Sequence, residues 1–175
     1  MTLPTELRTE RLLLRQWRAD DAERMAEIYA EPRFLEHMPA HDLAETRAQL
    51  DRFARGWSDY GFSHWAVEEA ASGRLIGRAG LMRHDDWPLE EYAVEVGWSF
   101  DPEYWGRGYA TEAGRAGVDC WLERLTEPQL ISITTPANVR SRAVMERLGF
   151  TLRGDTHWHR YDVVWYALDR PSTAV

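Results

Sequence analysis

The chain has 175 residues and a formal net charge of −8, and 44% of its residues are hydrophobic and 29% charged. This length and composition are typical of a globular chain that buries a core, so we expect a single domain over residues 1–175. The negative charge argues against general binding to nucleic acid or to an anionic membrane. Because the sequence has neither a long apolar run nor a signal-peptide pattern, we expect a cytoplasmic protein.

The predicted elements begin with a strand at 11–17, followed by two helices with apolar residues at helical spacing, at 20–31 and 44–57. Two strands come next, at 62–70 and 75–84, and a Ser72-Gly73 turn joins them. A hairpin is therefore expected in the first half of the chain.

The second half begins with a strand at 92–100 and a helix at 108–124, and then a short buried strand at 130–135. The helix at 138–148 ends at Gly149, a normal C-terminal cap. The last two strands are expected near 150–154 and 158–169. Hairpins combined with crossovers predict the α+β class.

Cys120 is the only cysteine, so no internal disulfide can form. Its place in an apolar helical pattern favours a buried core thiol over a nucleophile. The histidines show no recognised ligand spacing with a supporting carboxylate, so we expect no metal site.

Two glycines, Gly106 and Gly108, lie where the helix at 108–124 begins, in the stretch YWGRGYATEA. A helix N-terminus carries unpaired N–H groups and a partial positive charge, and glycine lets a phosphate approach the backbone. For an isolated pair of this kind, a tight turn that needs glycine for its dihedral angles is the favoured explanation. Thr111 stands where a Rossmann turn needs its third glycine, so that motif is rejected.

The stretch AVEVGWSFDPEYWGRGYATEA and the later NVRSRAVMERLGF resemble the GNAT superfamily of acyl-CoA-dependent N-acyltransferases. The likeness is greatest to its RimJ/RimL-like branch of ribosomal-protein N-terminal acetyltransferases, and it covers about residues 8–170. It implies the GNAT fold, a mixed central sheet of about six to seven strands with a splayed central strand pair and flanking helices. It also implies acetyl-CoA as co-substrate, CoA as product and no metal.

The resemblance assigns the donor side of the site. The pyrophosphate loop would be Trp105, Gly106, Arg107, Gly108, Tyr109, Ala110 and Thr111, with Trp105 in place of the family's glutamine or arginine. The pantetheine arm would pair with Trp98, Ser99 and Phe100 like an added strand. An N–H near Gly97 and Trp98 would receive the oxyanion, and Gly97 would permit a local bulge.

Asn138 and Ser141 form the second motif. Asn138 suits a helix N-cap, and the resemblance implies that its side chain also meets the cofactor arm. Ser141 would protonate or hydrogen-bond the leaving thiolate, with an ordinary first-turn helix residue as the equal alternative.

Glu95 is the candidate general base, because acyl transfer requires a neutral amine and most free amines are protonated at pH 7. Its neighbours Val94, Val96 and Trp98 make it a carboxylate in an apolar strand. Burying it unpaired would cost several kcal/mol. The alternative is an ion pair with an arginine, for example one from the strand at 75–84.

The acceptor site is expected between the two N-terminal helices and the loop joining the final strands. The acidic loop 85–91 could attract a cationic amine, although a solvated charged loop is the plainer explanation. Trp87 is expected to be the most exposed tryptophan. The candidate substrate-binding residues are Phe34, His37, Met38, Asp85, Asp86, Trp87, His157 and His159.

Three functions remain open from the sequence. The first is an N-acetyltransferase acting on a primary amine, which could be a protein N-terminus, an amino acid, a polyamine or an antibiotic. The second is an acyltransferase with a larger donor such as succinyl-CoA, and the third is a non-catalytic acyl-CoA-binding module. Glu95, Asn138 and Ser141 argue against the third. A homodimer is left open.

Overall fold

The computed structural model describes residues 2–36 and 41–171. Its helices are α1 (Asp21–Tyr29), α2 (Pro32–Leu35), α3 (Leu43–Tyr60), α4 (Tyr109–Arg124) and α5 (Val139–Arg147), with a short 3-10 helix η1 (Pro102–Tyr104). Its strands are β1 (Leu7–Arg8), β2 (Leu12–Arg15), β3 (His64–Glu69), β4 (Arg74–His84), β5 (Ala93–Phe100), β6 (Gln129–Thr134), β7 (Thr151–Trp158) and β8 (Tyr161–Asp169).

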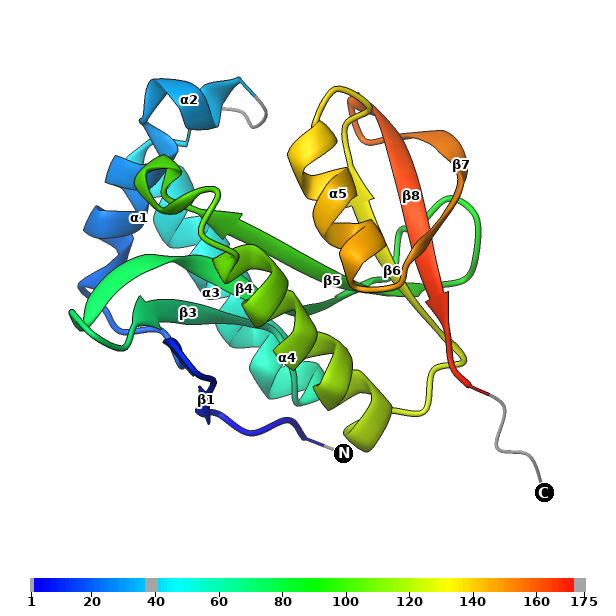
Figure 1. Ribbon diagram of the computed structural model, residues 1–175, viewed down its shortest axis with the longest axis horizontal. Coiled ribbons are helices and arrows are strands. Elements are labelled where there is room, and N and C mark those ends of the chain that lie inside the picture. The colour runs from blue at the N-terminus through cyan, green and yellow to red at the C-terminus, as the bar shows by residue number, and fades with distance from the viewer. Residues whose placement is uncertain (1, 37–40, 172–175) are drawn as a thin grey trace.

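These strands form a single mixed sheet in the order β1-β2-β3-β4-β5-β6-β8-β7 (Figure 1). Neighbouring strands run antiparallel except β5 and β6, which are parallel. The predicted α+β class and mixed sheet are confirmed. In the described residues the sheet has eight strands, one more than the upper expectation, because the two residues of β1 pair with β2.

Local signals account for several element ends. Asp42 and Glu45 form a capping box at the start of α3, and Gly61 ends that helix at φ 77°. The short helix α2 was not predicted, although Glu31 caps it and Pro32 begins it. Strand β7 is longer than expected, so residues 156–158 belong to a strand and not to the joining loop. The cause is a register that continues without a shift from the pair Gly154–Trp165 to the pair Trp158–Tyr161, beyond which only a tight turn remains.

Helices cover both faces of the sheet, with α4 in front of it in Figure 1 and α3 behind it. Gly117 of α4 packs so closely on β5 that a Cβ there would lie 2.9 Å from Val96 Cγ2. Val96 and Trp98 therefore face α4, and the alternation of a strand turns Glu95 and Gly97 toward the face that carries α1 and α3. Cys120 of α4 is buried as expected, and burial raises the pKa of its thiol to about 11.

Strands β5 and β6 separate soon after they meet, which confirms the splayed central pair. Their ladder holds one residue pair, Glu95 with Ile131, while β6 continues to pair with β8 through Thr134. The bulge expected at Gly97 is wrong, because β4 and β5 keep an unbroken register from Gly77–Phe100 to His84–Ala93. The opening comes from divergence of β6. None of the described helices is long and apolar enough to cross a membrane.

Candidate active site

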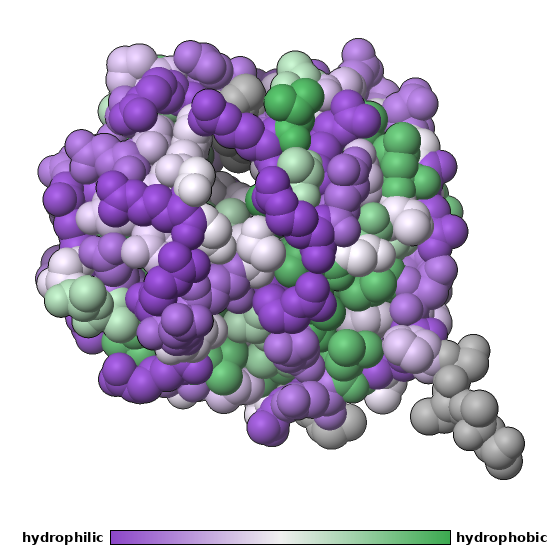
Figure 2. Space-filling model, in the orientation of Figure 1, coloured by the Kyte–Doolittle hydropathy of each residue, from purple (hydrophilic) through white to green (hydrophobic). Residues whose placement is uncertain are grey.

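A cavity of about 2180 Å³ lies where β5 and β6 separate. Figure 2 shows the molecule hollowed on this face, with a mainly hydrophilic rim. The predicted residues that line it are Phe34, Asp86, Glu95, Gly97, Trp98, Ser99, Phe100, Trp105, Gly106, Gly108, Tyr109, Ala110, Thr111, Asn138, Ser141 and His159. Of the predicted residues that the structure describes, Arg107, Asp85, Trp87 and His157 lie off its wall. His37 and Met38 fall outside the described residues.

The loop before α4 has the backbone that its glycines predict. Gly106 and Gly108 have φ values of 77° and 85°, in the left-handed region where a side chain is strained. Gly108 is the N-cap of α4 and has no side chain with which to bond the first-turn N–H groups. A Cβ on Gly106 would meet nothing within 4 Å among the described residues. The start of α4 is therefore open to an anion.

Side chains from elsewhere hold this loop in place. Arg11 donates from Nη1 to the carbonyl oxygen of Arg107 at 2.8 Å, and its Nη2 lies 2.7 Å from Glu112 of α4. Trp105 donates from Nε1 to the carbonyl oxygen of Phe100 at 2.8 Å, while the guanidinium of Arg140 lies 4.9 Å from its ring. Trp105 thus joins the end of β5 to the start of α5.

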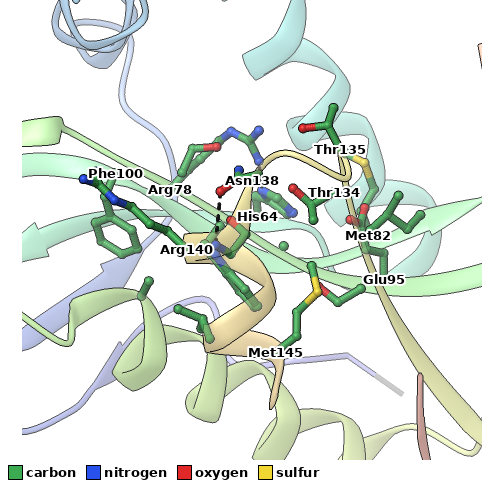
Figure 3. Close-up of a pocket in the computed structure, with 18 of the residues that line it drawn as sticks. His64, Arg78, Met82, Glu95, Phe100, Thr134, Thr135, Asn138, Arg140 and Met145 are labelled. Carbon is green, nitrogen blue, oxygen red and sulfur yellow. Dashed lines mark hydrogen bonds between the residues drawn. The ribbon is translucent and has the colours of Figure 1, made fainter. Parts of the chain in front are cut away.

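Asn138 caps α5 as predicted, because its Oδ1 accepts a hydrogen bond from the backbone N–H of Ser141 at 3.1 Å. This bond is the dashed line at Asn138 in Figure 3. Ser141 is half-buried and lines the cavity. Both residues of the second motif therefore lie in the same cavity as the glycine loop.

Glu95 is paired, but with a histidine and not with the arginine considered from sequence. Its Oε2 lies 2.7 Å from Nε2 of His84, and the two side chains are 15% and 12% exposed. His84 is on β4, the strand from which a partner was expected. The ring of Trp158 packs edge-on against His84 with centroids 4.7 Å apart. The sequence reasoning missed His84, although it shares the alternation of β4 with Met82, the register partner of Glu95.

The loop 85–91 folds onto the β7–β8 hairpin, which overturns the exposure expected for Trp87. This side chain is only 3% exposed and packs edge-on against Trp158 at 5.5 Å and Trp165 at 6.0 Å. The buried hairpin face supplies the partners that a reading of the loop alone could not include. Trp87 supports the wall around His84 from behind.

Two of the four acidic side chains of this loop, Asp85 and Asp86, are paired. Asp85 lies 2.6 Å from Nε of Arg83 and accepts from the hydroxyl of Tyr60 at 2.7 Å. Asp86 lies 3.2 Å from Nε2 of His159. These contacts leave less free negative charge at the cavity than the sequence pattern suggested. His157 pairs with Asp162 at 2.9 Å on the exposed hairpin.

Two further polar residues, His64 and Arg78, line the same face of the sheet as Glu95 (Figure 3). His64 is 2% exposed and its ring stacks on Phe53 at 4.9 Å. Nη1 of Arg78 lies 2.6 Å from Nδ1 of His64, and Nε donates to the hydroxyl of Tyr29 at 3.0 Å. Burial, with the nearby charge of Arg78, holds the pKa of His64 well below its usual value. Sequence reasoning missed both; the signal was a polar residue at alternate positions of two apolar strands.

Comparison with known proteins agrees with this geometry. The family model described as an acetyltransferase (GNAT) domain matches residues 11–151. A crystal structure of an acetyltransferase from Agrobacterium tumefaciens is 31% identical, with a TM-score of 0.81, and covers 97% of this chain and 96% of its own.

A curated relative, the uncharacterized N-acetyltransferase YnaD of Bacillus subtilis, is 25% identical over 83% of this chain and 82% of its own. RimL, a ribosomal-protein alpha-N-acetyltransferase solved in complex with coenzyme A, superposes with a TM-score of 0.75 at 16% identity. The match covers 95% of this chain and 97% of that one. At this identity the likeness to RimL shows the fold alone.

Proposed function

The chain belongs to the GNAT family of acetyltransferases, and we propose that it moves an acetyl group from acetyl-CoA to a primary amine, with Glu95 as the general base. The observation that carries this proposal is the pair Glu95–His84 at the point where β5 and β6 separate. The carboxylate of Glu95 lies on the open face of the sheet, and a proton that it takes from an amine can be shared with the imidazole of His84. We treat residues 8–170 as the core of one such domain.

The reaction balances with groups of this chain. Glu95 accepts a proton from the ammonium, and the neutral nitrogen attacks the thioester carbonyl carbon to form a C–N bond. A backbone N–H at Gly97 or Trp98, on the strand edge that β6 leaves free, would stabilise the resulting oxyanion. As the carbonyl re-forms, the C–S bond breaks, the nitrogen loses its remaining extra proton, and that proton neutralises the CoA thiolate, while Glu95 releases the proton it first accepted to solvent. Ser141, at the start of α5, is the proposed donor of a hydrogen bond to that sulfur.

The donor binds by its phosphates in this proposal. Backbone N–H groups at 106–111 would hold the pyrophosphate at the N-terminus of α4, and the arm would run beside Trp98, Ser99 and Phe100. Support comes from the left-handed glycines and the anchored loop. A location in the cytoplasm, where acetyl-CoA is available, accords with this proposal.

The test is a thiol-release screen of the purified protein. Acetyl-CoA is offered with free amino acids, peptides, polyamines and amine antibiotics, and succinyl-CoA is offered in a parallel series. Release of thiol that depends on one acceptor class, together with the acetylated amine by mass, supports the proposal. Faster release from succinyl-CoA would favour the larger donor. Acetyl-CoA binding without turnover on any amine would point to a non-catalytic module.

A further inference from the structure

The described residues include two deeply buried arginines in very different surroundings. Arg15 is 5% exposed and contacts two carboxylates, Asp21 at 2.7 Å and Glu68 at 2.6 Å. Arg78 is 9% exposed, and no described carboxylate lies within ion-pair distance of it. Burying a charge without an opposite charge is costly. Arg15 is therefore compensated within the fold, and Arg78 is not.

The two hydrogen-bond partners of Arg78 are neutral, and so is the ring of Phe53, whose centroid lies 5.5 Å from the guanidinium. Its Nε donates to the hydroxyl of Tyr29, and its Nη1 lies 2.6 Å from Nδ1 of His64. A guanidinium has only donors, so Nδ1 must accept, and the proton of the neutral ring is on Nε2. That Nε2 is buried and has no hydrogen-bond partner in the described structure. The polarising charge of Arg78 makes this unused N–H a stronger donor.

The unused N–H lies beside the proposed base. His64, Gly80 and Gly97 stand in register across β3, β4 and β5. The missing side chain of Gly97 leaves room for the ring of His64, whose Cε1 lies 3.3 Å from the point where a Cβ on Gly97 would be. Nε2 of His64 lies 3.4 Å from the point where a Cβ on Gly97 would be, and Oε1 of Glu95 lies 3.7 Å from that same point. One small ligand can thus contact both groups.

Resting on the proposed function, we propose that Arg78 and His64 form a binding site for a carboxylate on the acceptor, which makes the acceptor an α-amino acid. The amine faces Glu95, and one oxygen of the carboxylate, which is attached to the same carbon as the amine, accepts from Nε2 of His64. Arg78 lines the same cavity, so its positive charge offsets the negative charge of the bound carboxylate. The acceptor thus supplies the opposite charge that Arg78 lacks within the fold. A polyamine has no group for this site, and a peptide N-terminus offers a neutral carbonyl there.

The decisive experiment compares free L-amino acids with their amides, which carry the same amine and side chain without the negative charge. Thiol release from acetyl-CoA is measured for both across pH 7–9, because the amine of an amide loses its proton at lower pH. We expect the value of kcat/KM to be at least about tenfold higher for the acid, mostly through KM, which corresponds to about 1.4 kcal/mol. Equal or better use of the amide, or of peptides, would overturn the proposal.

Variants locate the effect. Arg78→Met should remove the preference for the acid, and Arg78→Lys should restore part of it. His64→Phe keeps the ring stacked on Phe53 but loses the N–H, so the preference should shrink, while His64→Gln, which keeps an N–H donor, should retain more of it. Arg74→Met is the control, because Arg74 is exposed on the same strand and lies off the cavity. A preference that survived both Arg78→Met and His64→Phe would contradict the assignment.

Two outcomes separate this inference from the proposed function. If the wild-type protein acetylates no amine at all, the proposed function fails. If it acetylates amines but ignores the carboxylate, only the present inference fails. The dissociation constant for acetyl-CoA is the internal check, because substitutions at Arg78 and His64 should leave it unchanged. A folded Arg78→Met protein that binds acetyl-CoA more weakly would assign Arg78 to the acetyl-CoA site instead.

Discussion

The loop 105–111 and the pocket around Arg78 line the same cavity but are built from different parts of the chain. The loop is contiguous and presents backbone N–H groups where α4 begins. The pocket draws single side chains from α1, α3, β3 and β4, namely Tyr29, Phe53, His64 and Arg78. A site made of backbone N–H groups, as we propose for the loop, should tolerate changes of side chain. A pocket of assembled side chains should tolerate few changes, so variants can separate the two regions.

The two buried arginines differ in whether a carboxylate pairs with them. Burial lowers the pKa of Arg15, but hydrogen bonds and charge from Asp21 and Glu68 more than offset this and raise it. The pocket holds Arg78 without such compensation. Removal of Arg15, whose charge is paired within the fold, should therefore lower the free energy of unfolding, whereas removal of Arg78 should not.

The largest expected effect follows from that contrast. Arg15→Met leaves Asp21 and Glu68 buried without Arg15, so the free energy of unfolding should fall by about 3–5 kcal/mol. Arg78→Met removes an uncompensated charge, and it should change stability by no more than about 1 kcal/mol, or increase it. Urea unfolding of both proteins measures the difference. Equal destabilisation by the two substitutions would mean that Arg78 serves the fold.

The next effect concerns turnover on the acceptor side. Glu95→Gln keeps the shape of the side chain but cannot take a proton, so kcat should fall by about 100-fold or more at neutral pH. That loss corresponds to about 2.7 kcal/mol in the barrier. Binding of acetyl-CoA, measured by calorimetry, should be unchanged. A folded variant that turns over like the wild type would remove Glu95 from the mechanism.

A smaller effect is expected on the donor side, where binding of acetyl-CoA should change and recognition of the acceptor should not. Gly108→Glu places a negative side chain at φ 85°, where the phosphate is proposed to bind. The dissociation constant for acetyl-CoA should rise at least about tenfold, or about 1.4 kcal/mol. The discrimination between an amino acid and its amide, measured at saturating acetyl-CoA, should survive. Because φ is strained in this variant, Gly108→Ala is the control for backbone strain without charge. Equal losses in the two variants would assign the effect to strain.

The same contrast explains what the sequence could predict. The glycine loop and the Asn138 cap were found because each depends on neighbours close in the chain, whereas the opening of β5 from β6 was expected only from the family resemblance. His64, Arg78 and Glu95 come from three strands and meet only through sheet register, which no local pattern encodes. The burial of Trp87 depends on a hairpin about 70 residues later, which is a tertiary effect that overrides the polar appearance of its loop.

The last prediction uses pH to test how His64 is held. Burial and the charge of Arg78 keep the pKa of His64 below that of an unfolded histidine, with a further contribution from His84. Below pH ~6.5 His64 is therefore protonated in the unfolded chain but not in the folded chain, so the free energy of unfolding must fall on acidification. One such group contributes about 1.4 kcal/mol per pH unit until the folded pKa is reached.

His64→Gln removes this titration while keeping an acceptor for Arg78 and a donor for the cavity. The unfolding free energy of the wild type minus that of the variant should be constant above pH 7, and it should decrease as the pH falls from 6.5 to 5. The charge of Glu95 faces the same pocket, and it and the other histidines are common to both proteins, so their titration largely cancels in the difference. Parallel stability curves over that range would show that His64 takes up its proton at the same pH in the folded as in the unfolded chain, so that neither burial nor the charge of Arg78 lowers its pKa. The buried ring would then not be held neutral by its surroundings, and the assignment of Nδ1 as acceptor and Nε2–H as donor would fail below pH ~6.5.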